Sequence, residues 1–413
     1  MKKFFLSFLT FMLLLCSLPY QVVLADELDL PAKSAIAVEA DTGKILYEKD
    51  SEKKRDVGGL STLLTTYLIF EAIHEKKLSL KDPIKLSEKA LALNDIEGAG
   101  TLPMEANQYT VEQLLTALLV GNSSTAALAL AEKVGGSEKS FVEKMKQKLS
   151  EWGIQSPHLI NATGLNTQTI SGDPDGKGDE NQLSAYDIAV IAKHLLQDFP
   201  EVTKYTSKPT ALFSNTQIEN PNLMLEGMPN YRSGVDGLRV SNSTKGGITF
   251  AASTTQNGIH MITVVLGVEA VDGDPYARFV ATSSLMNYVV RTFVSSIVVK
   301  EGDPYGKSKA TVMDGKSETV LAVAKKDFYI VEKQGSQAEP KIQFKSNQES
   351  FRAPVKSGTN LGKLHYTDPD KIGRGYLEDQ EPTVDMVAGR TIEKSFFLKV
   401  WWNEFVRYVN EKL

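Results

Sequence analysis

The strand-like segments on either side of a long helical block constrain the fold of this chain more than any other feature of its sequence. Residues 34–50 read SAIAVEADTGKILYEKD, two short runs joined by a D-T-G turn, which predicts a β-hairpin. Strand-like runs return at residues 248–254 and 260–268, and a helical pattern over residues 276–293 follows them. Strands, then helices, then strands with a closing helix predict one sheet with helices packed on both of its faces.

Helical periodicity dominates the segment between these strands. Leu60, Leu64 and Leu68 fall on one helical stripe, and the runs VEQLLTALLV and STAALALAEKV continue the helical character. Residues 161–181 interrupt it, and their content of Gly, Asp, Asn and Thr predicts an exposed loop. A further helix is expected over residues 185–196.

The character of the chain changes after residue 295. Short alternating runs such as VLAVA, FYIVE and KIQFK predict a smaller all-β domain over residues 295–388. Residues 389–413 then predict an amphipathic helix, with one apolar side made of Leu398, Trp401, Trp402, Phe405, Val406, Val409 and Leu413.

Two interpretations of this terminal helix remain open. Its apolar side either packs on the β domain or lies in the surface of a membrane. The adjacent Trp401 and Trp402, with basic residues around them, favour the membrane surface. Charged residues recur too often for the helix to span a bilayer.

The first 25 residues predict a secretory signal peptide that is removed before Asp26. Lys2 and Lys3 precede a short apolar run, and small residues stand before the expected cleavage site. Removal takes away Cys16, the only cysteine, so the mature chain has no disulfide and no thiolate ligand. The formal charge moves from −5 to −7 because two lysines leave and no acid does. An exported, mildly acidic chain is a poor candidate for binding nucleic acid.

Several stretches, taken in their order and spacing, resemble one known family. They are residues 34–50, STAALALAEKVGG, NATGL at 161–165, SAYDIA at 184–189, GVDGL at 234–238 and FAAST with VVLGV. Over nearly the whole mature sequence the chain resembles the low-molecular-mass penicillin-binding proteins, the serine D-Ala-D-Ala carboxypeptidases. The resemblance implies an α/β fold of the penicillin-binding protein/β-lactamase type over residues 26–294, in which an antiparallel sheet carries helices on both faces and a helical subdomain. It also implies the β domain and a membrane-anchoring helix over residues 389–413.

The resemblance implies a catalytic plan built on three motifs, S-x-x-K, S-x-N and K-T-G. Serine and lysine three residues apart share one helical face, so the lysine can take the serine's proton as the hydroxyl attacks a peptide carbonyl. The second motif supplies a proton relay and a substrate-holding amide. The third lies on an edge strand and meets the terminal carboxylate of the substrate.

The first motif is broken in this chain. Its flanks place Gly59 at the nucleophile position and Thr62 at the lysine position. Ser61 cannot substitute, because it is turned about 200° around the helix axis from Gly59. Since losing a catalytic serine costs on the order of 10⁶ in turnover, we expect covalent carboxypeptidase chemistry to be absent.

The other two motifs are also altered. Asn122 and Ser124 stand at the serine and asparagine positions of S-x-N. The K-T-G positions are Arg239, Val240 and Ser241, which are the expected substrate-binding residues. Only the change from lysine to Arg239 keeps the charge. Arg239 is therefore expected either to grip a terminal carboxylate or to behave as an ordinary strand residue that faces solvent or pairs with Asp236.

No other catalytic or cofactor site is predicted. The five histidines are scattered without metal-ligand spacing, and the acidic loop at residues 173–179 lacks the glutamate that would complete a calcium loop. The sequence therefore predicts no metal and no cofactor.

Two functions follow from the resemblance. The first is an exported, catalytically inactive relative of the carboxypeptidases, held at the outer face of the cytoplasmic membrane or in the cell wall. It would bind peptidoglycan stem peptides or a protein partner of wall synthesis. The alternative is a serine-type D-Ala-D-Ala carboxypeptidase, residual or active, that trims peptidoglycan pentapeptides. A purely structural role, in which the cleft is idle, also remains open.

Overall fold

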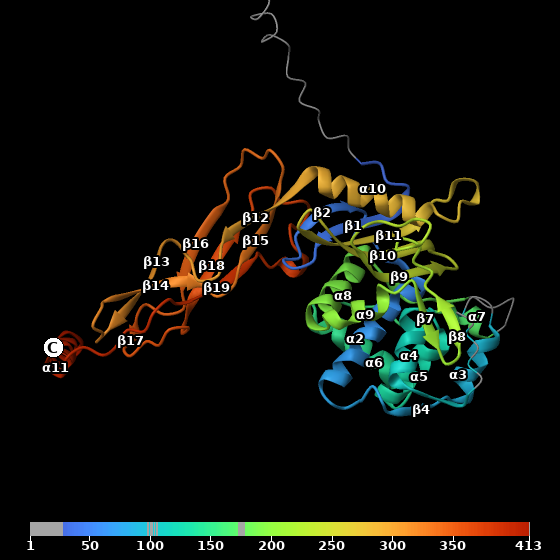
Figure 1. The fold of residues 1–413 in the computed structure, drawn as a ribbon, viewed down its shortest axis with the longest axis horizontal. Helices are drawn as coiled ribbons and strands as arrows, with labels where there is room; N and C mark the ends of the chain where they lie inside the picture. Colours follow the sequence, from blue (N-terminus) through green and yellow to red (C-terminus); the bar gives the residue numbers. More distant parts are fainter. Residues whose placement is uncertain are drawn as a thin grey trace, which may run out of the picture.

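A computed structural model of the chain describes residues 28–96, 99, 102, 104, 106–171 and 178–412. The signal peptide predicted for residues 1–25 lies outside this part of the chain. The described residues form a larger domain, a slender β domain and a terminal helix (Figure 1).

A five-stranded antiparallel sheet forms the centre of the larger domain. Its strands, in spatial order, are β2 (Ile45–Lys49), β1 (Ala32–Glu39), β11 (Ile259–Val268), β10 (Gly247–Gln256) and β9 (Val235–Ser243). Register pairs such as Ala37 with Thr263 join the first strands of the chain to the late ones. The expected hairpin and the later strands are confirmed, and β9 is left as an edge of the sheet.

Helices cover both faces of this sheet, as the sequence predicts. Helix α10 (Ala277–Thr292) lies on one face, where Leu285 and Met286 are buried in a cluster with Phe250. Helix α8 (Ala185–Asp198) and the helical subdomain lie on the other face (Figure 1). The penicillin-binding protein/β-lactamase-like arrangement is confirmed.

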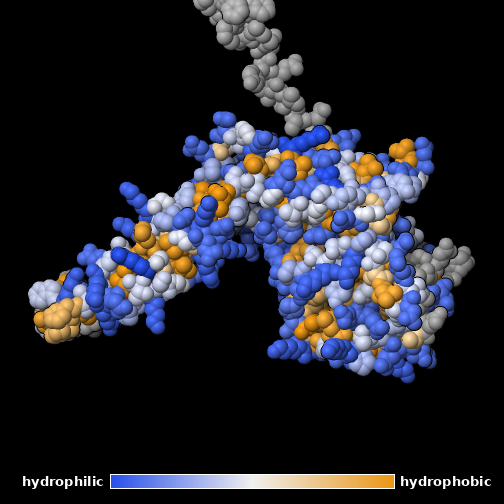
Figure 2. All heavy atoms as spheres, in the orientation of Figure 1, coloured by the Kyte–Doolittle hydropathy of each residue, from blue (hydrophilic) through white to orange (hydrophobic). Residues whose placement is uncertain are grey.

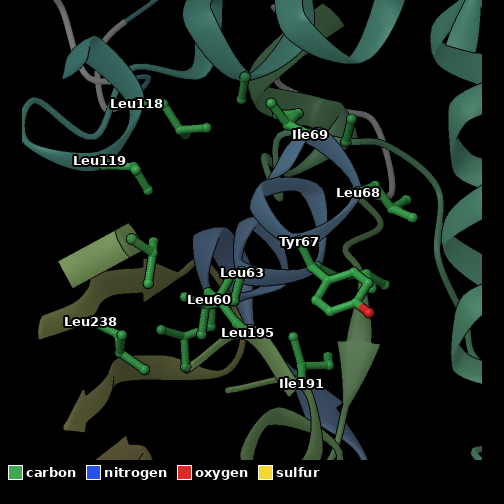
Figure 3. Close-up of a cluster of buried hydrophobic side chains, with 14 of the residues drawn as sticks. Leu60, Leu63, Tyr67, Leu68, Ile69, Leu118, Leu119, Ile191, Leu195 and Leu238 are labelled. Carbon is green, nitrogen blue, oxygen red and sulfur yellow. The ribbon is translucent and has the colours of Figure 1, made fainter. Parts of the chain in front are cut away.

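Helix α2 (Thr62–His74) is the central helix of the helical subdomain. Nearly every residue in it is buried, because neighbouring helices and the sheet surround it. Figure 3 shows Leu63 and Tyr67 of α2 among Leu118, Leu195 and Leu238 of other elements. The surrounding helices are α4 (Val111–Leu119), α5 (Ser124–Gly135) and α6 (Glu138–Glu151).

Shorter elements connect these helices and strands. In chain order they are β3 (Arg55–Asp56), η1 (Gly58–Ser61), β4 (Pro83–Lys85), α3 (Glu88–Ala92), η2 (Leu93–Asp95), β5 (Gln108–Thr110), α7 (Thr167–Ser171), β6 (Gln182–Leu183), η3 (Pro200–Val202), α9 (Thr203–Thr206), β7 (Thr210–Phe213), β8 (Thr216–Glu219) and η4 (Val271–Gly273). The hairpin of β7 and β8 was not among the expected elements.

The β domain contains a six-stranded sheet and a two-stranded ribbon. The sheet follows the order β16-β18-β19-β14-β13-β17, and the ribbon pairs β12 with β15. Alternate residues such as Ala322, Leu364 and Met386 point into its own core. The elements are β12 (Phe293–Val299), β13 (Pro304–Met313), β14 (Thr319–Ala324), β15 (Phe328–Lys333), β16 (Lys341–Ser346), β17 (Phe351–Arg352), β18 (Asn360–Thr367), η5 (Leu377–Asp379) and β19 (Thr383–Ala388).

A buried ion pair fastens the β domain to the larger domain. Lys44 Nζ lies 2.7 Å from Asp368 Oδ2, and their side chains are only 2% and 1% exposed. Lys44 Nζ also donates to the carbonyl of Val331 at 2.7 Å, and Tyr376 donates its hydroxyl to Asp368 at 3.1 Å. Removing one partner of such a pair leaves an uncompensated buried charge, so this contact fixes how the two domains meet.

A second contact reinforces this junction. Glu378 Oε2 accepts a hydrogen bond from Lys193 Nζ at 2.9 Å, and Glu378 Oε1 lies 3.0 Å from His194 Nε2. The adjacent Leu377 is buried in the core of the larger domain. The segment around η5 therefore belongs to both domains.

The terminal helix α11 (Phe397–Lys412) begins later than residue 389, where the sequence analysis placed its start. Residues 389–396 belong to the β domain instead, because Ile392 pairs with Val355 and is buried. The helix leaves apolar side chains in solvent, with Trp401 62% and Trp402 58% exposed. Figure 2 shows hydrophobic side chains gathered at this end of the molecule. Among the described helices, none is long and apolar enough to cross a membrane.

The Glu378 contact predicts a pH-dependent stability. The hydrogen bond from His194 and the charge of Lys193 lower the pKa of Glu378 from 4.5 to about 2. Because the folded pKa lies below the unfolded one, the stabilisation is present above about pH 4.5 and is lost as the pH falls towards 2. Between about pH 6 and pH 3 the wild type should lose on the order of 2 kcal/mol more than Glu378→Gln.

Urea titrations at the two pH values measure this difference. Glu339→Gln, which changes an exposed carboxylate of the β domain, is the matched control and should behave as the wild type. Equal losses of stability in the wild type and Glu378→Gln would contradict the role of this contact.

Candidate functional site

A cleft of about 850 Å³ lies beside the edge strand β9. Its walls come from β9, η1, the turn that precedes α5, the segment before β6 and the first turn of α10. Six of the seven residues predicted for the site line it, namely Gly59, Asn122, Ser124, Arg239, Val240 and Ser241. The seventh, Thr62, is buried below the cleft and donates its hydroxyl to the carbonyl of Gly59 at 2.6 Å.

The backbone of Gly59 lies against strand β9. Its N–H donates to Ser241 Oγ at 2.7 Å. A Cβ at residue 59 would lie 3.0 Å from Ser241 Oγ and 3.7 Å from Arg239 Nη2. A side chain at this position would therefore enter the cleft beside Arg239, and Ser241 would have to shift to admit it.

Neighbouring hydroxyl groups do not replace a side chain at residue 59. Ser61 donates to the carbonyl of Gly58 at 3.0 Å, accepts from Asn181 at 2.8 Å and is fully buried away from the cleft. Ser123 caps helix α5 by accepting from the N–H of Ala126 at 3.2 Å. Ser124 lines the cleft, and no lysine or histidine is among the described lining residues.

Arg239 brings a buried positive charge to the cleft. The residue is 5% exposed, and Nη1 donates to the carbonyl of Leu118 at 2.6 Å. Nε has no hydrogen-bond partner among the described residues, and none of their carboxylates lies within ion-pair distance. Burial lowers the pKa of Arg239 to about 9. The expected alternative, a guanidinium in solvent or paired with Asp236, is wrong, because Asp236 accepts from the Ser253 hydroxyl instead.

Arg278 adds a second guanidinium that the sequence analysis missed. It stands in the first turn of α10, where Nη1 donates to the carbonyl oxygens of Ser241 at 2.7 Å and Thr249 at 3.1 Å. Burial lowers its pKa to about 10. An arginine at the start of a largely apolar helical pattern is the sequence signal that would have singled it out.

Asn122 connects the turn that precedes α5 to the edge strand β9. Its φ of 56° is left-handed, a conformation that asparagine tolerates better than most residues. Its Nδ2 donates to the carbonyl of Val240 at 2.9 Å. This bond uses a carbonyl on the open edge of β9. Strand β9 is therefore connected to the turn before α5 through Asn122, and to η1 through Ser241.

Residues 161–181 were expected to form an exposed loop, and this expectation is wrong for the described part. Asn161 is buried, and its Oδ1 accepts from the N–H groups of Thr163 at 3.2 Å and Gly164 at 2.7 Å. Glu180 is also buried and accepts from three groups, those of Asn166, Ser243 and Thr244. Internal hydrogen bonds satisfy these polar groups, and composition alone does not reveal that. Residues 172–177 lie outside the described chain.

Gly164 shows why this segment packs so closely. Its φ is +75°, and a Cβ on it would lie 2.2 Å from the carbonyl oxygen of Gly58. Only glycine permits that approach. The segment before β6 and strand β9 therefore hold η1 between them.

The fold and the cleft define a protein of the penicillin-binding protein/β-lactamase class. Residues 21–270 match the D-alanyl-D-alanine carboxypeptidase family, and residues 293–394 match the C-terminal domain of penicillin-binding protein 5. The chain belongs to the D-alanyl-D-alanine carboxypeptidase family.

Relatives extend over most of the chain. It is 28% identical over 346 residues to the D-alanyl-D-alanine carboxypeptidase DacF of Bacillus subtilis, which covers 82% of each chain. A crystal structure of a peptidoglycan synthesis regulatory factor (PBP3) from Streptococcus pneumoniae is 45% identical, with a TM-score of 0.85, and the match covers 89% of this chain and all of that one. Penicillin-binding protein 5 of Haemophilus influenzae, at 23% identity and a TM-score of 0.68, shares the fold.

We predict from the cleft that restoring the two residues of the first motif will not restore carboxypeptidase activity. Gly59→Ser with Thr62→Lys should leave turnover of a D-Ala-D-Ala peptide at least about 100-fold below that of an active family member, because the new serine meets Ser241 and lacks the relay and carboxylate contacts. Release of D-alanine measures this turnover.

The matched comparison is a variant with all three motifs restored. It adds Asn122→Ser, Ser124→Asn, Arg239→Lys, Val240→Thr and Ser241→Gly to the two changes. This variant should exceed the double variant in turnover. Near-family turnover by the double variant alone would show that the second and third motif positions matter little.

Proposed function

We propose that this chain is an exported, catalytically inactive cell-wall protein whose cleft binds the carboxyl end of peptidoglycan stem peptides without cleaving them. The observation that carries the proposal is the arrangement of Gly59 beside the guanidinium of Arg239, which is buried with no carboxylate of the described residues within ion-pair distance. The alternative, a residual carboxypeptidase, needs a nucleophile that residue 59 does not supply.

The absence of a side chain at residue 59 argues against covalent catalysis. An acyl-enzyme requires a hydroxyl that attacks and a base that takes its proton. In the described lining of the cleft, Ser124 is a hydroxyl without a neighbouring lysine or histidine. The N–H of Gly59 is also engaged by Ser241, so a carbonyl oxygen would have to displace that hydroxyl before it was polarised.

The charge of the cleft supports binding of a carboxylate. A buried cation without a counter-charge is costly, and a bound carboxylate would supply that charge. Guanidinium groups bind carboxylates strongly, and Arg239 Nη2 would lie 3.7 Å from a Cβ at residue 59, beside the space that glycine leaves. Nε of Arg239 is buried and has no hydrogen-bond partner among the described residues. Arg278 adds positive potential from the neighbouring wall.

The relatives fit this proposal in two ways. By its name, the matched carboxypeptidase family acts on D-alanyl-D-alanine. A peptide with this sequence at its end carries a free carboxylate. The Streptococcus pneumoniae structure is described as a peptidoglycan synthesis regulatory factor. With the signal peptide predicted for residues 1–25, we place the protein outside the cytoplasmic membrane.

Titration with a stem peptide that ends in D-Ala-D-Ala tests the cleft. The wild type should bind with a Kd of about 0.1–1 mM, because one charged contact contributes only a few kcal/mol against the cost of immobilising the ligand. Arg239→Ala should weaken binding by at least about tenfold. Calorimetry or NMR measures both affinities.

Two controls sharpen this titration. Arg291→Ala removes an exposed arginine of α10 and should bind as the wild type does. The same peptide with a C-terminal amide should bind as weakly to the wild type as the acid binds to Arg239→Ala. Equal affinity of the wild type and Arg239→Ala, or no binding at millimolar peptide, would rule out a carboxylate site at Arg239.

We also propose that α11 holds the protein on the membrane surface. Its exposed apolar side chains, including Trp401, Trp402 and Phe405, suit the boundary between headgroups and acyl chains. Anchoring by this helix supports a location at the outer face of the cytoplasmic membrane.

Shortening the chain tests the anchor. A protein that ends at Ser395 keeps the Val355–Ile392 pairing of the β domain and should lose at least about 90% of its sedimentation with anionic vesicles. The double variant Trp401→Ser with Trp402→Ser, which keeps the full length of the chain, should bind the vesicles more weakly than the wild type. Unchanged sedimentation of the shortened chain would place the anchor elsewhere.

A further inference from the structure

The outward face of the β domain carries a row of lysines along strands β16 and β18. In β18, Leu364 and Tyr366 are buried in the core of the domain, so Lys363 and His365 point to the opposite side. In β16, Lys341 and Lys345 are exposed at alternating positions of the neighbouring strand. Figure 1 shows the two strands side by side, and Figure 2 shows hydrophilic side chains projecting along this domain.

The register brings two of these lysines directly together. Lys345 pairs with Lys363, and Gln343 pairs with His365. Directly opposed residues of antiparallel strands have Cβ atoms about 5 Å apart, and like charges in that position destabilise the sheet. Burial and the charges of Lys345 and Lys363 lower the pKa of His365, against the opposing effect of the Glu381 carboxylate.

Acidic residues balance only part of this charge. Asp385 lies opposite Lys363 on the next strand, but its ion pair is with Lys325, at 3.9 Å. Among the described residues, no carboxylate lies within 4.0 Å of Lys341, Lys345 or Lys363. Asp385 therefore offsets part of the charge of Lys363, and the charges of Lys341 and Lys345 are left for solvent or for a ligand.

Protection of the sheet edge does not explain the whole arrangement. Lysine on an edge strand discourages pairing with other chains, and β16 is such an edge. Lys363, however, stands on β18, which is paired on both sides by β16 and β19. An interior strand needs no such protection. Asp385 opposite Lys363 offsets part of the charge of that lysine, but it does not account for Lys345 on its other side.

We propose that this basic face binds a linear, phosphate-rich polyanion along β16 and β18. A single phosphate between Lys345 and Lys363 would turn their repulsion into two favourable contacts. Lys341, four residues from Lys345, is about 13 Å away along the strand, so only an extended anion reaches both. The neighbouring outward side chains Gln343 and Thr367 are polar, which favours a polymer in water over insertion into a bilayer.

Fluorescence anisotropy with labelled long-chain inorganic polyphosphate tests the proposal on the full mature chain. Lys345→Gln with Lys363→Gln should weaken binding about tenfold or more at low salt. The slope of log affinity against log salt should fall by about 1 to 2, because about one counterion is released for each lysine contact. Thermal unfolding checks that these exposed substitutions leave the fold intact.

A matched control distinguishes the lysines of this face from exposed lysines elsewhere on the protein. Lys133→Gln with Lys144→Gln removes two exposed lysines of α5 and α6 and should bind polyphosphate as the wild type does. Equal affinity of the two double variants would overturn the proposal, as would a wild type that does not bind polyphosphate. Binding to phosphatidylglycerol vesicles that depends on Lys345 and Lys363, without polyphosphate binding, would also overturn it and assign the face to a membrane.

Discussion

The contact between η1 and the edge strand β9 determines the shape of the candidate site. Gly58 and Gly59 lie between β9 and the segment that contains Gly164, and the N–H of Gly59 is bound by Ser241. This close packing is possible because the sheet joins strands from both ends of the larger domain and brings β9 beside the start of the buried helix α2. Residue 59 and Arg239 lie next to each other in the lining of the cleft that this packing leaves.

The same contact changes what the cleft can do chemically. A nucleophile and its base need a hydroxyl and an amine within hydrogen-bonding reach of each other. Here residue 59 has no side chain, and the Thr62 hydroxyl bonds to the backbone below the cleft. The charged residues that line the cleft are Arg239, Arg278, Glu180 and Glu219, and Glu180 is held by hydrogen bonds from Asn166, Ser243 and Thr244. The proposal that the cleft holds a carboxylate therefore depends on Arg239, which has no carboxylate within ion-pair distance among the described residues.

Local pattern predicted most of the fold and the site, and tertiary contacts decided the rest. Alternation and turns predicted the hairpin at residues 34–50 and the late strands, and the motif flanks predicted residues that the fold brings into one cleft. Composition failed for residues 161–181, because buried Asn161 and Glu180 satisfy their polar groups internally. The role of Arg278 and the start of α11 depend on contacts with distant segments, and sequence periodicity does not encode these.

Intact-protein mass spectrometry after incubation with penicillin tests the central claim, that this family member forms no acyl-enzyme. An active carboxypeptidase of the family serves as the positive control and should gain the mass of one penicillin. Our account predicts that the mature chain keeps its mass under the same conditions. A stoichiometric adduct on Ser124, or on any other residue of the cleft, would contradict it.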